Sequence, residues 1–179
     1  MSIRRRGTPA HGFFRRLDAV ARAAFPATSC AVLMVLAASP IGLPSAMAAV
    51  ALACVFFWSL FRPASMAPPY VFALGLLQDL LSFAPLGVGI LTLLLLHGVT
   101  LRARRVLARQ SFLLVWLAFC GMAAGAVTLG FILQALLGFR LPPVMPALHL
   151  LGLTIGFYPA LAWVLTRLHR AMQRAEDLA

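Results

Sequence analysis

The sequence predicts an all-α, polytopic membrane protein in which six helices form a bundle and both termini are cytoplasmic. Hydrophobic residues make up 63% of the 179 residues and charged residues only 11%, whereas soluble domains carry about 25% charged residues. The apolar residues form long runs separated by proline and glycine, as in membrane-spanning helices. The arginines lie at the ends of these runs, which is typical of cytoplasmic loops that follow the positive-inside rule.

Six apolar runs are candidates for spanning helices, each of which needs about 20 residues. The fourth run is short and the fifth is long, and helix tilt absorbs such differences. The runs do not alternate between apolar and polar residues, so helices are expected rather than the strands of a barrel. The predicted helices cover residues 22–40, 43–61, 66–83, 86–101, 112–137 and 146–166.

The division of residues 66–101 into two helices depends on length and charge. As a single helix they would extend about 54 Å, against a hydrocarbon core of about 30 Å. With six spans and a cytoplasmic N-terminus, Arg140 is the only one of the fifteen arginines on the outer side. With five spans the arginines divide almost evenly, so the positive-inside rule favours six. The net charge of +11 is therefore attributed to topology, and no nucleic-acid partner is expected.

The chain divides into a basic arm, a spanning domain and a short polar tail, which cover residues 1–21, 22–166 and 167–179. Within the arm, the sequence GFFRRLDAVARAAF places apolar side chains on one helical face and Arg15, Asp18 and Arg22 on the other. This pattern fits an amphipathic helix on the inner membrane surface. It fits a simple start to the first spanning helix equally well.

Asp79 is the only acidic residue between Asp18 and Glu176, and it lies near the outer end of the third predicted helix. An aspartate at the bilayer centre costs about 2.5–3.5 kcal/mol and less near the interface, so it should face protein. It can brace the following turn or a neighbouring helix, belong to a proton or substrate path, or contact another membrane protein. Structural or assembly roles are favoured, because a single acid without a defined partner is weak evidence for chemistry. Candidate polar partners at similar depth are Gln134, Arg140 and His149.

Small residues recur at four-residue spacing on the last two predicted helices, in GMAAG and GLTIG. Such faces let two helices approach closely in a membrane. Packing of the two helices inside one molecule is the favoured interpretation, and docking of a partner's helix is the alternative. The residues concerned are Gly121, Gly125, Gly152 and Gly156.

Catalysis is not expected, and neither a metal nor a cofactor is predicted. The chain offers no pair of acids for general acid–base work. Its histidines are scattered without metal-ligand spacing, and no serine–histidine dyad is apparent. His97 is expected to make a hydrogen bond between helices.

The stretch FRPASMAPPYVFALGLLQDLLSFAPLG, residues 61–87, resembles the MreD family of bacterial rod shape-determining proteins. The resemblance rests on an Arg-Pro pair after the second predicted helix, on Gly-Leu-Leu-x-Asp-Leu-Leu, and on Pro-Leu-Gly. Phe83 and Ala84 depart from the family, whose members often have a small or polar turn there. The motif residues are Arg62, Pro63, Gly75, Asp79, Pro85 and Gly87.

The resemblance implies a non-enzymatic, multi-pass scaffold of the bacterial inner membrane that serves cell elongation and peptidoglycan synthesis. The implied partners are MreC, bound directly, MreB filaments, RodA with its transpeptidase partner, and anionic lipids at the cytoplasmic face. The resemblance also implies a bundle similar to the substrate-binding subunits of vitamin transporters. The alternative function is therefore a transporter subunit that binds a small molecule where Asp79, Gln134 and His149 converge.

Overall fold

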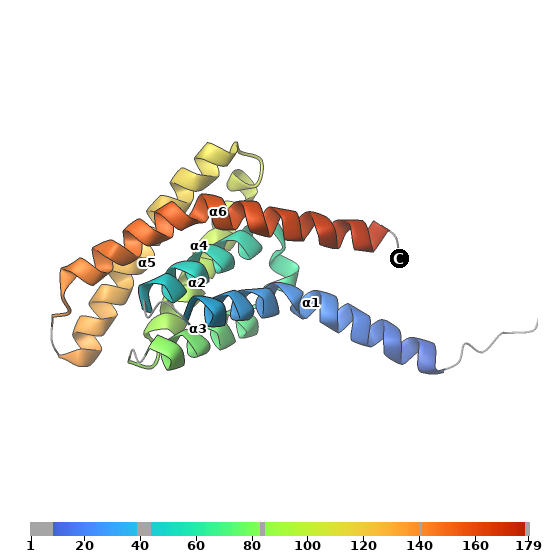
Figure 1. The fold of residues 1–179 in the computed structure, drawn as a ribbon, viewed down its shortest axis with the longest axis horizontal. Helices are drawn as coiled ribbons and strands as arrows, with labels where there is room; N and C mark the ends of the chain where they lie inside the picture. Colours follow the sequence, from blue (N-terminus) through green and yellow to red (C-terminus); the bar gives the residue numbers. More distant parts are fainter. Residues whose placement is uncertain (1–8, 39–43, 83–84, 140, 178–179) are drawn as a thin grey trace, which may run out of the picture.

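The structure is a computed structural model that describes residues 9–38, 44–82, 85–139 and 141–177 (Figure 1). These residues form six α-helices and one short 3₁₀ helix, and no strand occurs among them, which confirms the all-α class. The helices are α1 (Pro9–Ala38), α2 (Pro44–Phe61), η1 (Pro63–Ser65), α3 (Pro68–Ser82), α4 (Val88–Leu107), α5 (Phe112–Gly138) and α6 (Val144–Asp177).

Each predicted apolar run contains one helix, and residues 66–101 divide between α3 and α4 as predicted. Three helices are longer than predicted, since α1 begins at Pro9, α4 continues to Leu107 and α6 reaches Asp177. The added segments are rich in arginine and alanine, which favour helix. The polar tail after residue 166 is therefore helical as far as it is described. The apolar runs located the hydrophobic part of each helix and missed its polar ends.

The basic arm continues directly into the first apolar segment, which the sequence predicts to span the membrane. α1 is one helix of 30 residues with Pro26 inside it, as expected if the arm simply begins that helix. Residues 1–8 lie outside the described part of the chain. The first turns of α1 and the last turns of α6 project from the same side of the molecule (Figure 1).

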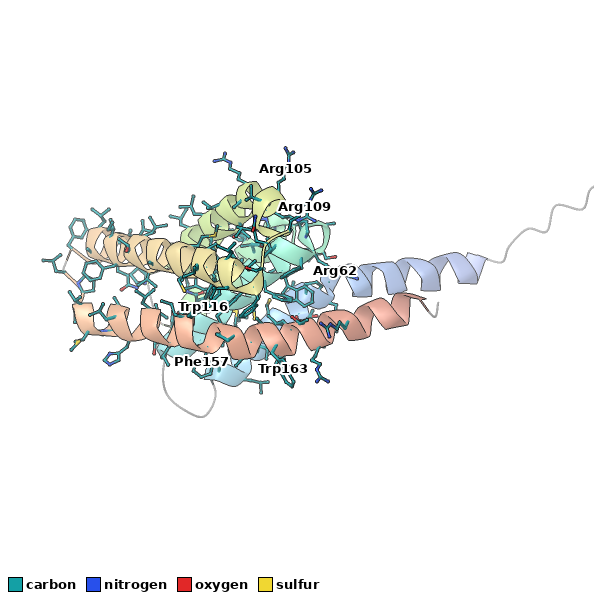
Figure 2. The ribbon with its side chains drawn as sticks, turned by 90° about the horizontal axis from the view of Figure 1, so that it is seen from above. Arg62, Arg105, Arg109, Trp116, Phe157 and Trp163 are labelled. Atoms are coloured by element: carbon teal, nitrogen blue, oxygen red, sulfur yellow. The ribbon has the colours of Figure 1, made fainter. Side chains whose placement is uncertain are left out.

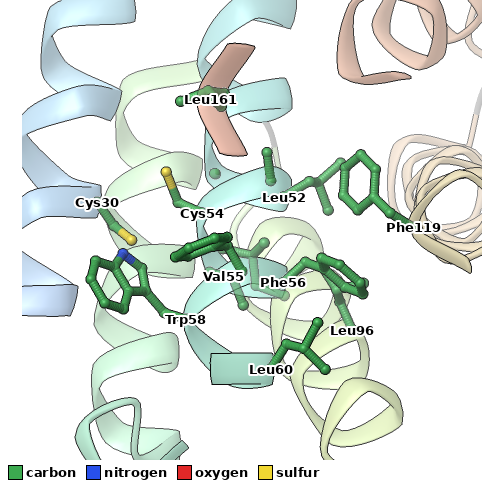
Figure 3. Close-up of a cluster of buried hydrophobic side chains, with 14 of the residues drawn as sticks. Cys30, Leu52, Cys54, Val55, Phe56, Trp58, Leu60, Leu96, Phe119 and Leu161 are labelled. Atoms are coloured by element: carbon green, nitrogen blue, oxygen red, sulfur yellow. The ribbon is translucent and has the colours of Figure 1, made fainter. Parts of the chain in front are cut away.

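α2 is the central helix of the bundle. It packs against α1, α3, α4 and α6, and every residue from Ala51 to Leu60 is buried. Figure 3 shows this core, with Cys30 of α1 beside Trp58 and with Phe119 of α5 beside Phe56. The rings of Phe56 and Phe119 lie 5.1 Å apart, centre to centre, and the ring of Tyr158 stacks on Phe119 at 4.1 Å. This aromatic cluster joins α5 and α6 to α2.

α5 and α6 form an antiparallel pair (Figure 1). Many of their large apolar side chains are exposed. Within the described residues they are the two helices long and apolar enough to cross a membrane, over Phe112–Gly138 and Val144–Leu168. Only 22% and 28% of their most apolar windows are buried inside the protein. In water such exposure would be unfavourable, whereas in lipid it carries no penalty.

Candidate functional site

Asp79 closes the turn between α3 and α4. It lies in the last turn of α3 and is 2% exposed. One carboxylate oxygen accepts a hydrogen bond from the backbone N–H of Gly87 at 2.8 Å, and the other accepts one from the N–H of Gly89 at 2.7 Å. Both oxygens therefore act as hydrogen-bond acceptors.

This arrangement caps α4 with a side chain from another helix. The first N–H groups of a helix have no partner inside it and carry a partial positive charge. Gly87 is the N-cap residue of α4 and has no side chain to supply that partner. Asp79 supplies it instead, and hydrogen bonds to a charged group each contribute about 1.5–3 kcal/mol. The only acidic residue between Asp18 and Glu176 is thus satisfied by backbone, in agreement with a brace for the turn.

Three glycines make this contact sterically possible. Gly87 has a φ of 106°, in the left-handed region that favours glycine. A Cβ on Gly75 would lie 2.5 Å from Cα of Ile90, and a Cβ on Gly89 would lie 2.5 Å from a carboxylate oxygen of Asp79. Only glycine at these positions lets α3 and α4 approach closely enough for the hydrogen bonds. We define Gly75, Asp79, Gly87 and Gly89 as the α3–α4 clamp.

The remaining motif residues lie outside the clamp. Arg62 and Pro63 are at the opposite end of α3, where Arg62 caps η1 and its carbonyl oxygen accepts a hydrogen bond from Ser65 N–H at 3.2 Å. Eleven residues of helix, about 17 Å, separate that end from Asp79. Pro85 precedes α4 and accepts a hydrogen bond from Val88 N–H at 3.3 Å. The family-like stretch therefore divides into two sites, one at each end of α3.

The predicted polar partners of Asp79 do not converge on it among the described residues. Gln134 and His149 are exposed on α5 and α6, and Arg140 lies outside the described residues, as do Phe83 and Ala84. The carboxylate of Asp79 instead accepts its hydrogen bonds from the backbone of the α3–α4 hairpin, where these side chains were expected to bind it.

The small-residue faces are open rather than packed. A Cβ added to any of the four glycines would meet no atom within 4 Å. The interpretation that they mediate packing of α5 against α6 is therefore wrong for the described part of the molecule. The faces remain candidates for contact with a partner. The glycines are Gly121, Gly125, Gly152 and Gly156.

A second buried polar site joins α2 to α4. Oγ of Ser59 lies 2.7 Å from Nδ1 of His97, with both residues buried. Near the same end of α4, Nε of Arg104 donates to the carbonyl oxygen of Leu60 at 2.9 Å. The interhelical hydrogen bond predicted for His97 is confirmed. Helix packing also brings together a serine and a histidine that are 38 positions apart, a contact that was not predicted from the sequence.

The sequence carried a signal for this pair. In the six-span topology, Ser59 and His97 both lie near the inner ends of their helices, and α2 and α4 run in the same direction. A polar residue buried in an apolar helix needs a partner at its own depth. Matching depths would have suggested the contact.

The Ser59–His97 pair is arranged to hold helices together. Ser59 is fully buried at 0% exposure, so its hydroxyl cannot reach a substrate in this structure. Among the described residues, no three His, Cys, Asp or Glu side chains gather to hold a metal ion. In the part of the chain that the structure describes, the carboxylate of Asp79 bonds to backbone and Ser59 bonds to Nδ1 of His97, whereas Nε2 of His97 and Oε1 of Gln78 are buried without a hydrogen-bond partner.

Comparison with known proteins gives one match. The family described as rod shape-determining protein MreD matches residues 24–165, which is well over half of the chain. The match includes α2 to α5 entirely, and with them the α3–α4 clamp and the Ser59–His97 pair. No curated protein and no solved structure matches the chain.

Proposed function

The chain belongs to the MreD family of rod shape-determining proteins, and from this premise we propose that it is a non-enzymatic scaffold of the cell-elongation complex. Membership of this family means that the chain is a membrane protein with a role in rod shape determination. The proposal adds a multi-pass protein of the bacterial inner membrane that binds MreC directly. Through MreC it helps to organise MreB filaments, RodA and the transpeptidase partner of RodA during peptidoglycan synthesis.

The observation that supports the scaffold role is that buried polar groups make hydrogen bonds between helices. The carboxylate of Asp79 bonds backbone amides, His97 bonds Ser59, and Arg104 bonds the last turn of α2. Each contact ties two helices together and leaves a rigid bundle with open apolar faces on α5 and α6. Such a molecule offers other membrane proteins a surface and offers a substrate no reactive group.

The distribution of arginine supports the proposed orientation. Figure 2 shows Arg62, Arg105 and Arg109 together at one end of the bundle, and the hydrogen bond from Arg104 to Leu60 joins the ends of α2 and α4 there. The guanidinium carbon of Arg167 lies 4.8 Å from the ring centre of the exposed Trp163. Tryptophan is typical of either membrane boundary, and arginine is typical of the cytoplasmic one. We assign this end to the cytoplasm, together with both termini.

A transporter subunit is not favoured by any contact in the described residues. Its binding site was expected where Asp79, Gln134 and His149 converge. Asp79 is instead buried in the clamp, and the other two side chains are exposed on separate helices.

Depletion of the protein in its rod-shaped host tests the scaffold against the transporter. The scaffold predicts cells that swell and become round while uptake of small molecules stays normal. A plasmid-borne wild-type copy, which should restore the rod shape, is the control. Cells that keep their shape but require an added nutrient would contradict the scaffold and support the transporter.

A further inference from the structure

α4 and α5 enclose an apolar groove that no helix of the described chain covers. Its volume is about 480 Å³, and its walls include Leu95, Val99, Gly125 and Leu129. Leu95 and Val99 are about half exposed, and Gly125 has open space where a Cβ would stand. The groove therefore reaches the outer surface of the bundle, where hydrocarbon surrounds the protein in the proposed topology.

The groove offers its occupant no free hydrogen-bond donor. Its polar side chain is that of Thr92, whose hydroxyl donates to the carbonyl oxygen of Val88 at 2.7 Å. The other lining side chains are apolar or absent. The part of a ligand that enters this groove must therefore be hydrocarbon, since a polar group there would lose its hydrogen bonds.

One end of the groove meets a cluster of arginines. Arg102 follows Val99 by three residues, so it continues the same face of α4 less than one turn further on. Arg109 lies in the short connection between α4 and α5, and Arg105 lies between them on α4. All three are exposed, and Figure 2 shows Arg105 and Arg109 at this end of the molecule. Within the described residues, no hydrogen bond or ion pair engages these three side chains.

The lining of the groove on α4 runs from Thr92 to Val99, and the groove together with the three residues that lead on to Arg102 matches the depth of one leaflet of a bilayer. Thr92 and Arg102 are ten residues apart on α4, which is about 15 Å along the helix axis. Half of a hydrocarbon core of about 30 Å is the same length. An inner-leaflet chain that starts at the arginines would end near Thr92.

We propose that the α4–α5 groove binds one anionic diacyl phospholipid of the inner leaflet, with an acyl chain in the groove and the phosphate at Arg102 and Arg109. A transmembrane helix of a partner fits less well, because it would cross both leaflets. Cytoplasmic flanks of such helices also carry Lys and Arg, which these arginines would repel. Basic sites beside spanning helices on the cytoplasmic side favour anionic head groups. The inference rests on the proposed orientation of the bundle.

Lipid retention by the purified full-length protein in mild detergent tests the site. Native mass spectrometry during titration with phosphatidylglycerol should show one lipid bound more tightly than the others. Gly125→Leu fills the groove and should weaken that lipid about tenfold or more. Gly152→Leu is the matched control, because Gly152 also has open space but lies on α6, and it should bind like wild type. Equal retention by wild type and both variants would overturn the proposal.

The head-group contact is tested separately, so that the result does not depend on one variant. Arg102→Gln with Arg109→Gln should reduce the preference for phosphatidylglycerol over phosphatidylcholine, by about fivefold for each arginine. Arg167→Gln, on α6, is the control and should keep the preference. An unchanged preference in the double variant would overturn the assignment of the phosphate.

The occupant is identified by a photo-reactive phenylalanine analogue in place of Leu95, a half-exposed residue of the groove wall, in cells. An adduct with a phospholipid supports the proposal, and an adduct with a helix of another protein or of a second copy overturns it. These outcomes are separate from the scaffold role. A protein that retains lipid normally but fails to restore the rod shape of depleted cells would count against the scaffold only. A protein that restores the rod shape but does not retain lipid as described above would count against the lipid site only.

Discussion

Asp79 shows how a single carboxylate can be accommodated in an apolar helix. Its two oxygens accept hydrogen bonds from the backbone N–H groups of Gly87 and Gly89 at the start of α4. A carboxylate and an unpaired backbone N–H are each unfavourable in hydrocarbon, and here each satisfies the other. The buried polar anchor at a helix turn that the sequence predicts agrees with this geometry, and its place on the outer side of the membrane stays a prediction. The partners were not predictable from side chains, because they are backbone N–H groups and because Gly89 carries no side chain to mark it.

Asp79→Asn should lower the stability of the purified protein by about 1.5–3 kcal/mol, since an amide cannot accept from both Gly87 and Gly89. Thermal unfolding in mild detergent measures the effect, with Gln134→Ala as a control at an exposed site. We also expect the variant to reach the membrane but to co-purify with less MreC. Normal stability of the variant would refute the clamp. Normal co-purification of MreC would show that the clamp is not needed for binding MreC.

Gly75→Ala should destabilise the protein by about 1–3 kcal/mol, because its Cβ would press on the backbone of Ile90. Gly98→Ala is the matched control on α4, where a Cβ meets no atom within 4 Å. The control should keep or raise stability, since alanine favours helix over glycine. Unfolding midpoints of the two variants decide the matter, and equal midpoints would show that α3 and α4 are not in close contact.

Among the helices, α4 is fixed at both ends by different neighbours. The clamp holds its first turn to α3, while His97 and Arg104 hold its later turns to α2. Helices in a membrane gain little from hydrophobic burial against one another, so packing and hydrogen bonds decide their arrangement. The sequence predicted that α4 exists and where its apolar part lies. It did not predict how far the helix continues, because arginine-rich segments beyond the hydrocarbon are also good helix formers.

The contact between α2 and α4 should appear as a coupling energy between Ser59 and His97. Ser59→Ala leaves the ring nitrogen of His97 without its partner, and His97→Leu removes the ring. We expect the two changes together to cost about 1 kcal/mol less than the sum of the single changes. A double-mutant cycle of unfolding free energies in detergent measures this. Ser59→Ala combined with Gln134→Ala serves as the non-contacting pair and should be additive. Additivity in the first pair would contradict the contact.

For the molecule as a whole, composition was enough to predict the class and the number of helices. Apolar runs and proline-rich breaks report directly on which segments avoid water. The small-residue faces misled, because the spacing of Gly121 and Gly125 shows that a close approach is possible and cannot show which neighbour approaches. In the structure the space beside them is open, and it forms part of the α4–α5 groove that we propose to bind a lipid.

Both termini should be cytoplasmic. A fluorescent protein fused after Ala179 should be bright in cells, and alkaline phosphatase fused at the same place should be inactive. The reverse pattern is expected for insertions in residues 141–143, which precede α6 and lie at the outer side in the proposed topology. Phosphatase activity at Ala179 would reject an even number of spans.

The clamp also has a consequence for how the chain enters the membrane during synthesis. α3 has only 15 residues, fewer than the roughly 20 of a self-sufficient span, and its carboxylate finds its donors eight and ten residues later in the chain. In the proposed topology, α3 alone would leave the translocon with an unsatisfied carboxyl group, whereas a hairpin of α3 and α4 leaves with that group already hydrogen-bonded. The clamp thus makes the pair, and not the single helix, the unit of insertion.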